Sequence, residues 1–340
     1  MRALKIILFV ILGLVGVFLA LGLIAPKEFT TTRSIVIDAP PELVFNTVND
    51  LSSWDSWSPW KEADPTIKST MGEITVGKGA TSSWVSENSG NGKMTITESH
   101  PNENLDVVIE FEGMGQADSD WDIKAVEGGA EASWSFHTKF PFPINAMMLF
   151  QDLEGNIHKD YDRGLELLKG VVEKKAEAMA NQKYNGYEVK RVPMPMQHFV
   201  AVRETVQMDK VTEFFTASLG KAMQAAQKNG AEIAGAPCGL YFTWDEASKT
   251  TDMAGAIPVK AKTDINGFSA VEIPASEALV IDYYGDYHNI GDAHTAMEQY
   301  ITATGVKTTP PAIEEYVTDP ETEKDASKWL TKVYYPLENK

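Results

Sequence analysis

The stretch RSIVIDAPPELVFNTVNDLSSWDSWSPW, residues 33–60, decides the fold of the first part of the chain. It completes a segment, residues 29–38, in which polar residues alternate with Ile and Val, as in a β-strand with one buried face. A Pro-Pro pair then ends the strand and begins a helix, in which Val44, Phe45 and Val48 recur at helical spacing. The stretch predicts a strand, a short helix and a tight turn rich in tryptophan.

Three of the eight tryptophans, Trp54, Trp57 and Trp60, recur at three-residue intervals in this turn. This spacing brings successive rings together on a tight helix, so at least one ring is predicted to pack beneath the turn. Packing is the commoner role of buried aromatic rings. In the other interpretation, Trp57 and Trp60 are candidates for binding an apolar ligand at the mouth of a cavity.

A run of antiparallel strands and one long helix are predicted next. Alternating segments separated by Gly, Asn and Asp turns occupy residues 80–85, 93–98, 105–111, 117–123 and 131–138. Residues 145–180 are predicted to form one helix, because apolar residues recur every three or four positions from Leu149 to Val172. The apolar stripe of this helix needs a partner, and the sheet supplies one.

This order of elements, with the small-Pro-x-x-x-Val/Leu-Phe helix and Trp-rich turn of residues 39–60, resembles the SRPBCC superfamily of START-like, polyketide-cyclase-like proteins. The resemblance implies an α+β helix-grip fold over residues 28–180, in which a curved antiparallel sheet wraps the long C-terminal helix. It also implies a hydrophobic cavity for lipids, polyketides or other apolar molecules.

The N-terminal segment, residues 6–25, consists of twenty uncharged residues, which as a helix would span about 30 Å, the hydrocarbon thickness of a bilayer. Arg2 and Lys5 precede it, which predicts a cytoplasmic N-terminus and globular domains outside the cytoplasm, periplasmic or at the outer surface. A cleaved signal peptide is the alternative, but Leu23 and Pro26 fit its cleavage rule poorly. Residues 1–27 are thus predicted to be a single-pass transmembrane anchor.

Composition excludes several classes of function. The 30 Lys and Arg against 48 Asp and Glu give a formal charge of −18, which would repel nucleic acid. A lone cysteine, Cys238, forms no intramolecular disulfide or thiolate metal site, and the six histidines show no metal-ligand spacing. The sequence predicts no metal, no cofactor and no nucleic-acid partner, and it identifies no protein partner.

The pattern restarts after residue 186 as two similar halves offset by about 80 residues. The first half is predicted to contain a strand at 197–205, a helix at 209–228 and strands at 240–244 and 254–259. The second half is predicted to repeat this order with a strand at 278–284, a helix at 289–303 and strands at 313–317 and 329–336. Together they predict a duplicated βαββ domain.

Three stretches of this part, YYGDYHNI at 283–290, IEEYVTDP at 313–320 and LTKVYYPL at 330–337, resemble the GyrI-like or AraC-type effector-binding domain. The resemblance covers residues 187–337, and the domain is predicted to occupy residues 186–340. It implies a groove between the two repeats that binds amphipathic, often cationic aromatic molecules around one central acidic side chain. By its place in the Glu-x-Tyr strand that residue is Glu314, with Tyr316 beside it.

Strand alternation sends Glu314 and Tyr316 to one face and Glu315 to the other, although a register slip would place Glu315 in the groove instead. A carboxylate among aromatic rings is poorly solvated and favours a ligand cation that also lies on ring faces. Candidates for the wall of the groove, each of which could equally belong to the core, are Tyr284, Tyr287, Trp244 and Tyr241.

These features together predict a membrane-anchored protein that sequesters or hands over a hydrophobic or amphipathic, cationic small molecule. Two alternatives stay open. In one, the protein is a hydrolase of a reactive small molecule, in which Glu314 with Tyr316 or His288 activates water. In the other, it is a scaffold that binds nothing. The sequence contains none of the common catalytic motifs, and His288 and His294 are interpreted as ordinary helix-start and helix-face residues.

Overall fold

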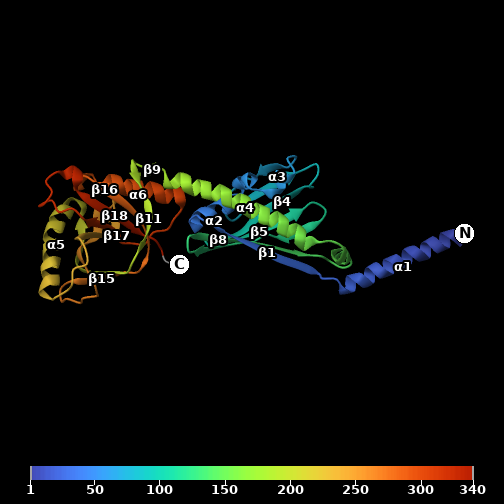
Figure 1. Cartoon of the computed structure of the whole chain (residues 1–340), viewed down its shortest axis with the longest axis horizontal. Coiled ribbons are helices and arrows are strands. Elements are labelled where there is room, and N and C mark those ends of the chain that lie inside the picture. Colours follow the sequence, from blue (N-terminus) through green and yellow to red (C-terminus); the bar gives the residue numbers. More distant parts are fainter. Residues whose placement is uncertain (1, 339–340) are drawn as a thin grey trace. The chain divides into compact units, whose positions relative to one another are not determined.

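A computed structural model describes residues 2–338, which divide into two compact units, Met1–Ala178 and Met179–Lys340 (Figure 1). Each unit is built on an eight-stranded sheet in which every strand pair is antiparallel. Each unit also carries helices that pack on its sheet. The α+β fold class predicted from the sequence is confirmed.

The first unit begins with the apolar helix α1 (Arg2–Ile24). The stretch Lys5–Ile24 is long and apolar enough to cross a membrane, and almost none of it is buried inside the structure. The chain leaves α1 and enters the edge strand β1 (Glu28–Ile37) within a few residues.

The first sheet has the strand order β1-β8-β6-β5-β4-β3-β2, and β7 pairs with β5 and β8. Its remaining strands are β2 (Lys68–Met71), β3 (Thr81–Val85), β4 (Gly92–His100), β5 (Asn104–Phe111), β6 (Gly115–Asp118), β7 (Trp121–Val126) and β8 (Gly129–Lys139). The prediction of a single strand at residues 117–123 is wrong. The chain breaks into β6 and β7 at Ser119 and Asp120, where the buried hydroxyl of Ser119 accepts a hydrogen bond from Nε1 of Trp134 at 2.8 Å.

The tryptophan-rich turn folds as α2 (Pro41–Asn49), the 3₁₀-helix η1 (Leu51–Ser56) and α3 (Pro59–Ala63). Trp54 and Trp57 are buried, with ring centroids 4.8 Å apart. They join an aromatic cluster in which Trp134 stacks on Trp121 at 4.5 Å and on Tyr161 of the long helix at 3.8 Å. Aromatic rings therefore pack between the sheet and the long helix of this unit.

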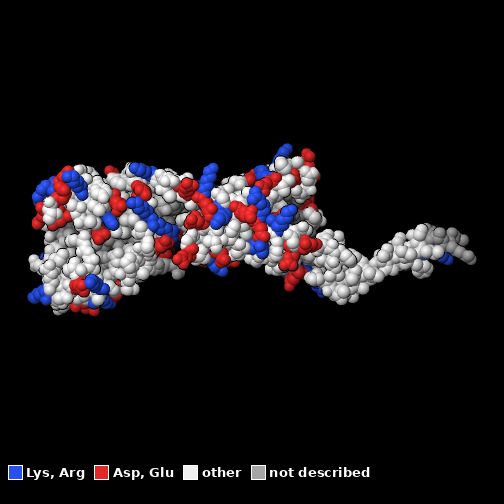
Figure 2. All heavy atoms as spheres, viewed as in Figure 1, with Lys and Arg blue, Asp and Glu red and all other residues white. Residues whose placement is uncertain are grey.

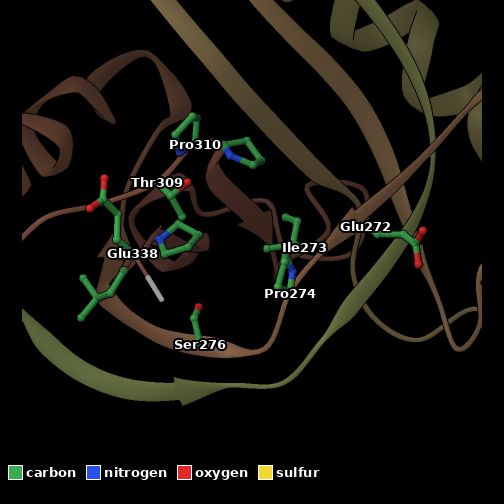
Figure 3. A pocket seen from close by; sticks show the side chains of 10 residues that line it. Glu272, Ile273, Pro274, Ser276, Thr309, Pro310 and Glu338 are labelled. Carbon is green, nitrogen blue, oxygen red and sulfur yellow. The ribbon is translucent and has the colours of Figure 1, made fainter. Parts of the chain in front are cut away.

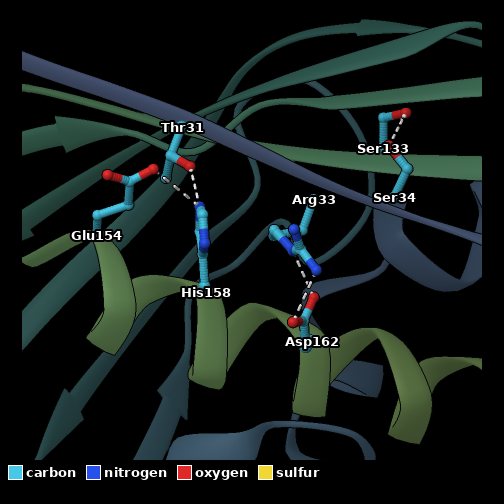
Figure 4. A network of polar contacts seen from close by, with 7 residues as sticks. All are labelled: Thr31, Arg33, Ser34, Ser133, Glu154, His158 and Asp162. Carbon is cyan, nitrogen blue, oxygen red and sulfur yellow. Dashed lines mark hydrogen bonds and ion pairs between the residues drawn. The ribbon is translucent and has the colours of Figure 1, made fainter.

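The long helix α4 runs from Leu153 to Ala180, so the predicted start at residue 145 is wrong. Residues Ile144–Phe150 form a separate 3₁₀-helix, η2, because Gln151 adopts an extended backbone and Asp152 then caps the first turn of α4 by accepting from the amide of Gly155 at 2.9 Å. Figure 4 shows how α4 is tied to β1: Arg33 donates two hydrogen bonds to Asp162, at 2.6 and 2.9 Å.

The second unit has the strand order β11-β16-β18-β17-β13-β14-β12-β15, next to a small hairpin of β9 (Lys183–Tyr184) and β10 (Tyr187–Glu188). The strands of this sheet are β11 (Lys190–Met194), β12 (Gln197–Gln207), β13 (Cys238–Asp245), β14 (Thr250–Val259), β15 (Ser269–Ile273), β16 (Ser276–Tyr284), β17 (Ala312–Tyr316) and β18 (Leu330–Pro336). The helices are α5 (Val211–Lys228) and α6 (Gly291–Thr304).

Two similar halves make up this sheet. One half is β12-α5-β13-β14 and the other is β16-α6-β17-β18, and they join where β13 pairs with β17. Gly239 lies opposite Glu314 in this central pair, and the neighbouring Cys238 is buried, opposite Glu315. The duplicated βαββ pattern predicted from the sequence therefore places Glu314 at the join between the repeats.

Candidate functional site

A cavity of about 1550 Å³ lies within the second unit, and we call it the groove. Its floor comes from the central strands β13 and β17, and residues of α5 and α6 line its sides. The turn before α6, the segment after β17 and the segments that precede β13 and β17 also contribute to the lining. The groove thus lies at the join between the two repeats.

Glu314 lies at the floor of the groove and is only 4% exposed. Its Oε2 accepts hydrogen bonds from the hydroxyls of Tyr316, at 2.7 Å, and Tyr241, at 3.3 Å. Its Oε1 lies 2.8 Å from Nε2 of His294 on α6. Three potential donors therefore surround the carboxylate, which is the environment that a charged carboxylate needs when it is withdrawn from water.

His294 also contacts the hydroxyl of Tyr335, which lies 3.0 Å from Nδ1. In the tautomer with hydrogen on Nε2, the imidazole donates to Glu314 while Nδ1 accepts from Tyr335. The ring is thus held between an acid and a phenol. An additional proton on Nδ1 would give an imidazolium paired directly with Glu314.

The tyrosines of this network remain protonated at ordinary pH. Burial, followed by the negative charge of Glu314, raises the pKa of Tyr241 and Tyr316 well above the usual value for a phenol. Burial likewise raises the pKa of Tyr335 to about 12. Tyr241 and Tyr316 are therefore permanent hydrogen-bond donors to the carboxylate at neutral pH.

Aromatic rings surround the carboxylate. Phe215 of α5 makes edge contacts with Tyr241 at 6.0 Å and with Tyr316 at 5.9 Å, and Tyr287 contacts Tyr316 at 5.3 Å. Trp244 contacts Tyr241 at 6.2 Å and is 56% exposed, which leaves much of its ring open to solvent or ligand. The groove therefore offers several ring faces within reach of one buried negative charge.

The charged groups of the groove are of one sign. Besides Glu314, the lining includes Glu246, Glu298 and Asp319. No Lys or Arg is among the described residues that line it. Within residues 2–338 no group of three His, Cys, Asp or Glu is placed to hold a metal ion. The electrostatics of the groove favour a cation, carried by an organic molecule that fits the aromatic walls.

The structure brings some of the sequence-predicted residues together and leaves others apart. Glu314, Tyr316, Tyr241, Tyr287 and Trp244 all line the groove. Tyr284 does not line it and is 60% exposed, because alternation along β16 buries its neighbour Tyr283 instead.

The other candidates also lie outside the groove. Glu315 points to the opposite face of the sheet, where it accepts a hydrogen bond from Tyr334 at 3.3 Å. Trp57 is fully buried in the aromatic cluster of the first unit, and the partly buried Trp60 donates to Asp160 at 3.1 Å. Both rings serve packing in this structure.

His294 is the site residue whose position the sequence interpretation missed. His288, which was considered as a partner for Glu314, is exposed at the rim and bonds Asp286 at 2.6 Å. A signal for His294 was present in the sequence, because it lies on the same helical stripe as the apolar residues Ile290 and Met297. A polar ring on an inward stripe points to a buried partner.

A second cavity, of about 320 Å³, lies beside the groove and shares Thr309 and Pro310 with it (Figure 3). Its other lining residues include Pro274, Ser276 and Glu338, and no aromatic side chain is among the described ones. Because it lacks both ring faces and a buried charge, it is a weaker candidate for a binding site than the groove.

Family models match both units. Residues 28–173 match the model described as polyketide cyclase / dehydrase and lipid transport, and residues 187–338 match the GyrI-like small molecule binding domain. The chain joins an SRPBCC-like domain to a GyrI-like domain. The resemblance seen in the sequence is thereby confirmed for both parts, and small-molecule binding follows as the general function of the GyrI-like domain.

Solved structures match parts of the chain at low identity. The C-terminal domain of EcmrR is 19% identical, with a TM-score of 0.40, and the match covers 45% of this chain and 99% of that one. SAV2435, solved with bound tetraphenylphosphonium, is 15% identical with a TM-score of 0.36, covering 45% and 94%. CV1439 from Chromobacterium violaceum is 18% identical with a TM-score of 0.33, covering 42% and 96%. No curated protein matched the chain.

Proposed function

We propose that this chain is a membrane-anchored binding protein whose GyrI-like groove sequesters or hands over lipophilic organic cations. The observation that carries the proposal is the buried carboxylate of Glu314 at the floor of a large groove with aromatic walls. A cation at this position gains both a charge partner and ring faces. A neutral ligand would gain only the apolar contacts, and an anion would be repelled.

The aromatic network supports binding over catalysis as the main role of Glu314. Its carboxylate already accepts hydrogen bonds from Tyr241 and Tyr316, so it is held in one position. A ligand cation can therefore interact with a preorganised charge, which lowers the entropic cost of binding.

The apolar helix α1 supports placing this groove next to a membrane. Arg2 and Lys5 precede the apolar stretch, so we propose a cytoplasmic N-terminus and globular domains outside the cytoplasm. Lipophilic cations concentrate in bilayers, and a tethered binder would meet them there. The ring-filled interior of the SRPBCC-like domain supports a structural role for that domain.

The proposal is tested by thermal unfolding of residues 27–340 with tetraphenylphosphonium and with tetraphenylborate, an anion of nearly the same shape. This fragment contains the whole lining of the groove. Because a ligand that binds only the folded state stabilises it, the cation should raise the midpoint and the anion should not.

Two variants make the test specific. Glu314→Gln should abolish the shift caused by the cation, whereas Glu315→Gln, on the other face of the same strand, should preserve it. An equal shift by the anion, or a shift that survives in Glu314→Gln, would show that apolar contacts alone hold the ligand and would refute the charge-based proposal.

Hydrolysis is a second candidate, and one observation favours it. His294 lies between Glu314 and Tyr335, an arrangement that could move a proton to or from a bound water. A panel of reactive esters and strained rings incubated with the chain tests this idea. Turnover that disappears in both Glu314→Gln and His294→Gln, while a ligand still binds, would support a hydrolase; absence of turnover across the panel leaves binding as the function.

A further inference from the structure

An uncharged segment lies where the apolar helix α1 ends. Residues 140–151 contain no charged side chain, although Lys139 and Asp152 flank them. Most of this segment is the 3₁₀-helix η2. Its large side chains are exposed to an unusual degree: Phe142 48%, Ile144 54%, Met147 48%, Leu149 45% and Phe150 72%.

This segment is fastened to the end of α1. The amide of Asn145, which is fully buried, donates to the carbonyl of Gly22 at 2.7 Å and to that of Ala25 at 3.0 Å. These carbonyls belong to the last turn of the helix or follow it directly, where no helical partner is available. The ring of Phe142 packs against Gly22, where an added Cβ would lie 3.1 Å from it. The segment therefore cannot drift from the helix end without exposing those carbonyls.

The backbone reinforces the same connection. The amide of Phe140 donates to the carbonyl of Lys27 at 2.8 Å, and Glu28 pairs with Lys139 at the ends of β1 and β8. Figure 2 shows an uncharged surface where α1 meets the rest of its unit. The apolar surface of Leu23 and Ile24, exposed by 75% and 76%, thus continues onto the segment.

We propose that residues 140–150, which we call the platform, lie in the interfacial layer of the bilayer at the end of α1 and hold the SRPBCC-like domain against the membrane surface. The inference rests on the proposed membrane insertion of α1. A large exposed apolar patch on a folded domain marks a docking surface. The patch on the platform is continuous with α1, an apolar helix that can span the bilayer, and this continuity identifies lipid as what covers the patch.

The hydrogen bonds from Asn145 to the carbonyls at the end of α1 agree with a lipid environment around the platform. Backbone carbonyls near the hydrocarbon boundary cannot rely on water, so they must be paired within the protein. A surface built for a protein partner would have no need to be locked to the end of a membrane-spanning helix. The platform and α1 thus form one unit that fixes the depth of the domain.

The test uses the full chain in lipid nanodiscs with a nitroxide label at Phe150→Cys. Collisions of the label with oxygen, which dissolves in lipid, are compared with collisions with a water-soluble nickel complex. Val126→Cys is the matched control, because Val126 is an exposed apolar residue of the same domain beside the opposite end of β8. The wild-type chain, whose single Cys238 is buried, controls for stray labelling.

We expect a ratio of oxygen to nickel collisions severalfold higher for Phe150→Cys than for Val126→Cys. Equal ratios would overturn the platform. Exclusion of both reagents from Phe150→Cys, with broadening between labels, would overturn it in favour of contact between two copies of the chain.

A third label, at Leu14→Cys in the middle of α1, tests whether α1 itself lies in the bilayer. It therefore distinguishes a failure of the platform from a failure of the membrane anchor. If Leu14→Cys lies in lipid and Phe150→Cys lies in water, only the platform is wrong. If Leu14→Cys is also in water, α1 does not span the bilayer, and both proposals fail.

Discussion

The Nε2 atom of His294 lies 2.8 Å from Oε1 of Glu314, although the two residues belong to different elements, α6 and β17. This contact holds the carboxylate of Glu314 from the side of α6. Besides Glu314, the groups that face His294 are Tyr335 and Tyr241. Both are phenols that stay neutral at physiological pH, because burial raises the pKa of each.

We predict that His294→Phe weakens cation binding, because the carboxylate of Glu314 loses one of the three potential donors that hold it in place. Losing such a hydrogen bond costs about 1–3 kcal/mol, or roughly 5- to 150-fold in affinity if the cost falls on binding. Calorimetric titration with tetraphenylphosphonium measures the affinity.

His294→Gln is the control variant, since its neutral amide can still donate to Glu314. It should bind the cation nearly as tightly as wild type. Equal affinities for wild type and His294→Phe would contradict the positioning role of this contact.

A methyl group on Gly239 should weaken ligand binding. Its Cβ would lie 2.7 Å from Cζ of Phe215 and 2.9 Å from the hydroxyl of Tyr316, so Gly239→Ala forces Tyr316 away from Glu314. Losing a hydrogen bond to a buried carboxylate costs about 1–3 kcal/mol, or roughly 5- to 150-fold in affinity if the cost falls on binding. Gly220→Ala is the control, because open space surrounds Gly220 and its substitution should leave the affinity unchanged. Calorimetric titration of Gly239→Ala and Gly220→Ala with tetraphenylphosphonium compares their affinities.

Gly164→Ala should destabilise the SRPBCC-like domain. The added Cβ would lie 2.7 Å from Trp134 and 3.2 Å from Pro59, and overpacking of this kind costs about 1–3 kcal/mol. In the same helix, Gly170→Ala meets open space and should instead stabilise by up to about 1 kcal/mol. Urea unfolding followed by near-ultraviolet circular dichroism of the tryptophans tests both; equal midpoints would contradict the close packing over Trp134.

The GyrI-like domain should lose stability steeply above pH 10. Unfolded tyrosines ionise near pH 10, whereas burial raises the pKa of Tyr335 to about 12 and those of Tyr241 and Tyr316 well above 10. Between these values the unfolded state binds fewer protons than the folded state, so the free energy of unfolding falls as pH rises.

Urea unfolding at pH 9, 10 and 11, together with tyrosinate absorbance, measures this effect. Tyr316→Phe should show a shallower decline, because one of the three phenols is absent. A decline that matches wild type would mean that Tyr316 ionises freely in the folded protein.

Much of the fold could be predicted from the sequence, because local periodicity decides it. Two-residue alternation placed Glu314 and Tyr316 on one face of β17, and three-residue spacing gathered Trp54 and Trp57 on a tight helix. The contact of His294 with Glu314 depends on how α6 lies over the sheet, which local pattern does not encode.

The start of the long helix shows a second limit of local pattern. Residues 145–150 continue its apolar periodicity, yet they form a separate 3₁₀-helix. The side-chain amide of Asn145 donates to the carbonyls of Gly22 and Ala25, more than a hundred residues earlier in the chain. The extended backbone of Gln151 separates η2 from α4, and apolar periodicity encodes neither feature.

The single cysteine gives this protein a natural kinetic reporter. Cys238 is buried in β13 beside the residue that faces Glu314, and burial raises the pKa of its thiol, which slows its reaction with alkylating reagents. Modification therefore requires local opening of the second sheet around β13, by movement of its strands or of the side chains that cover the thiol. The rate of alkylation measures how often the floor of the groove opens, and the slowing of that rate by a candidate molecule would reveal occupancy without any engineered label.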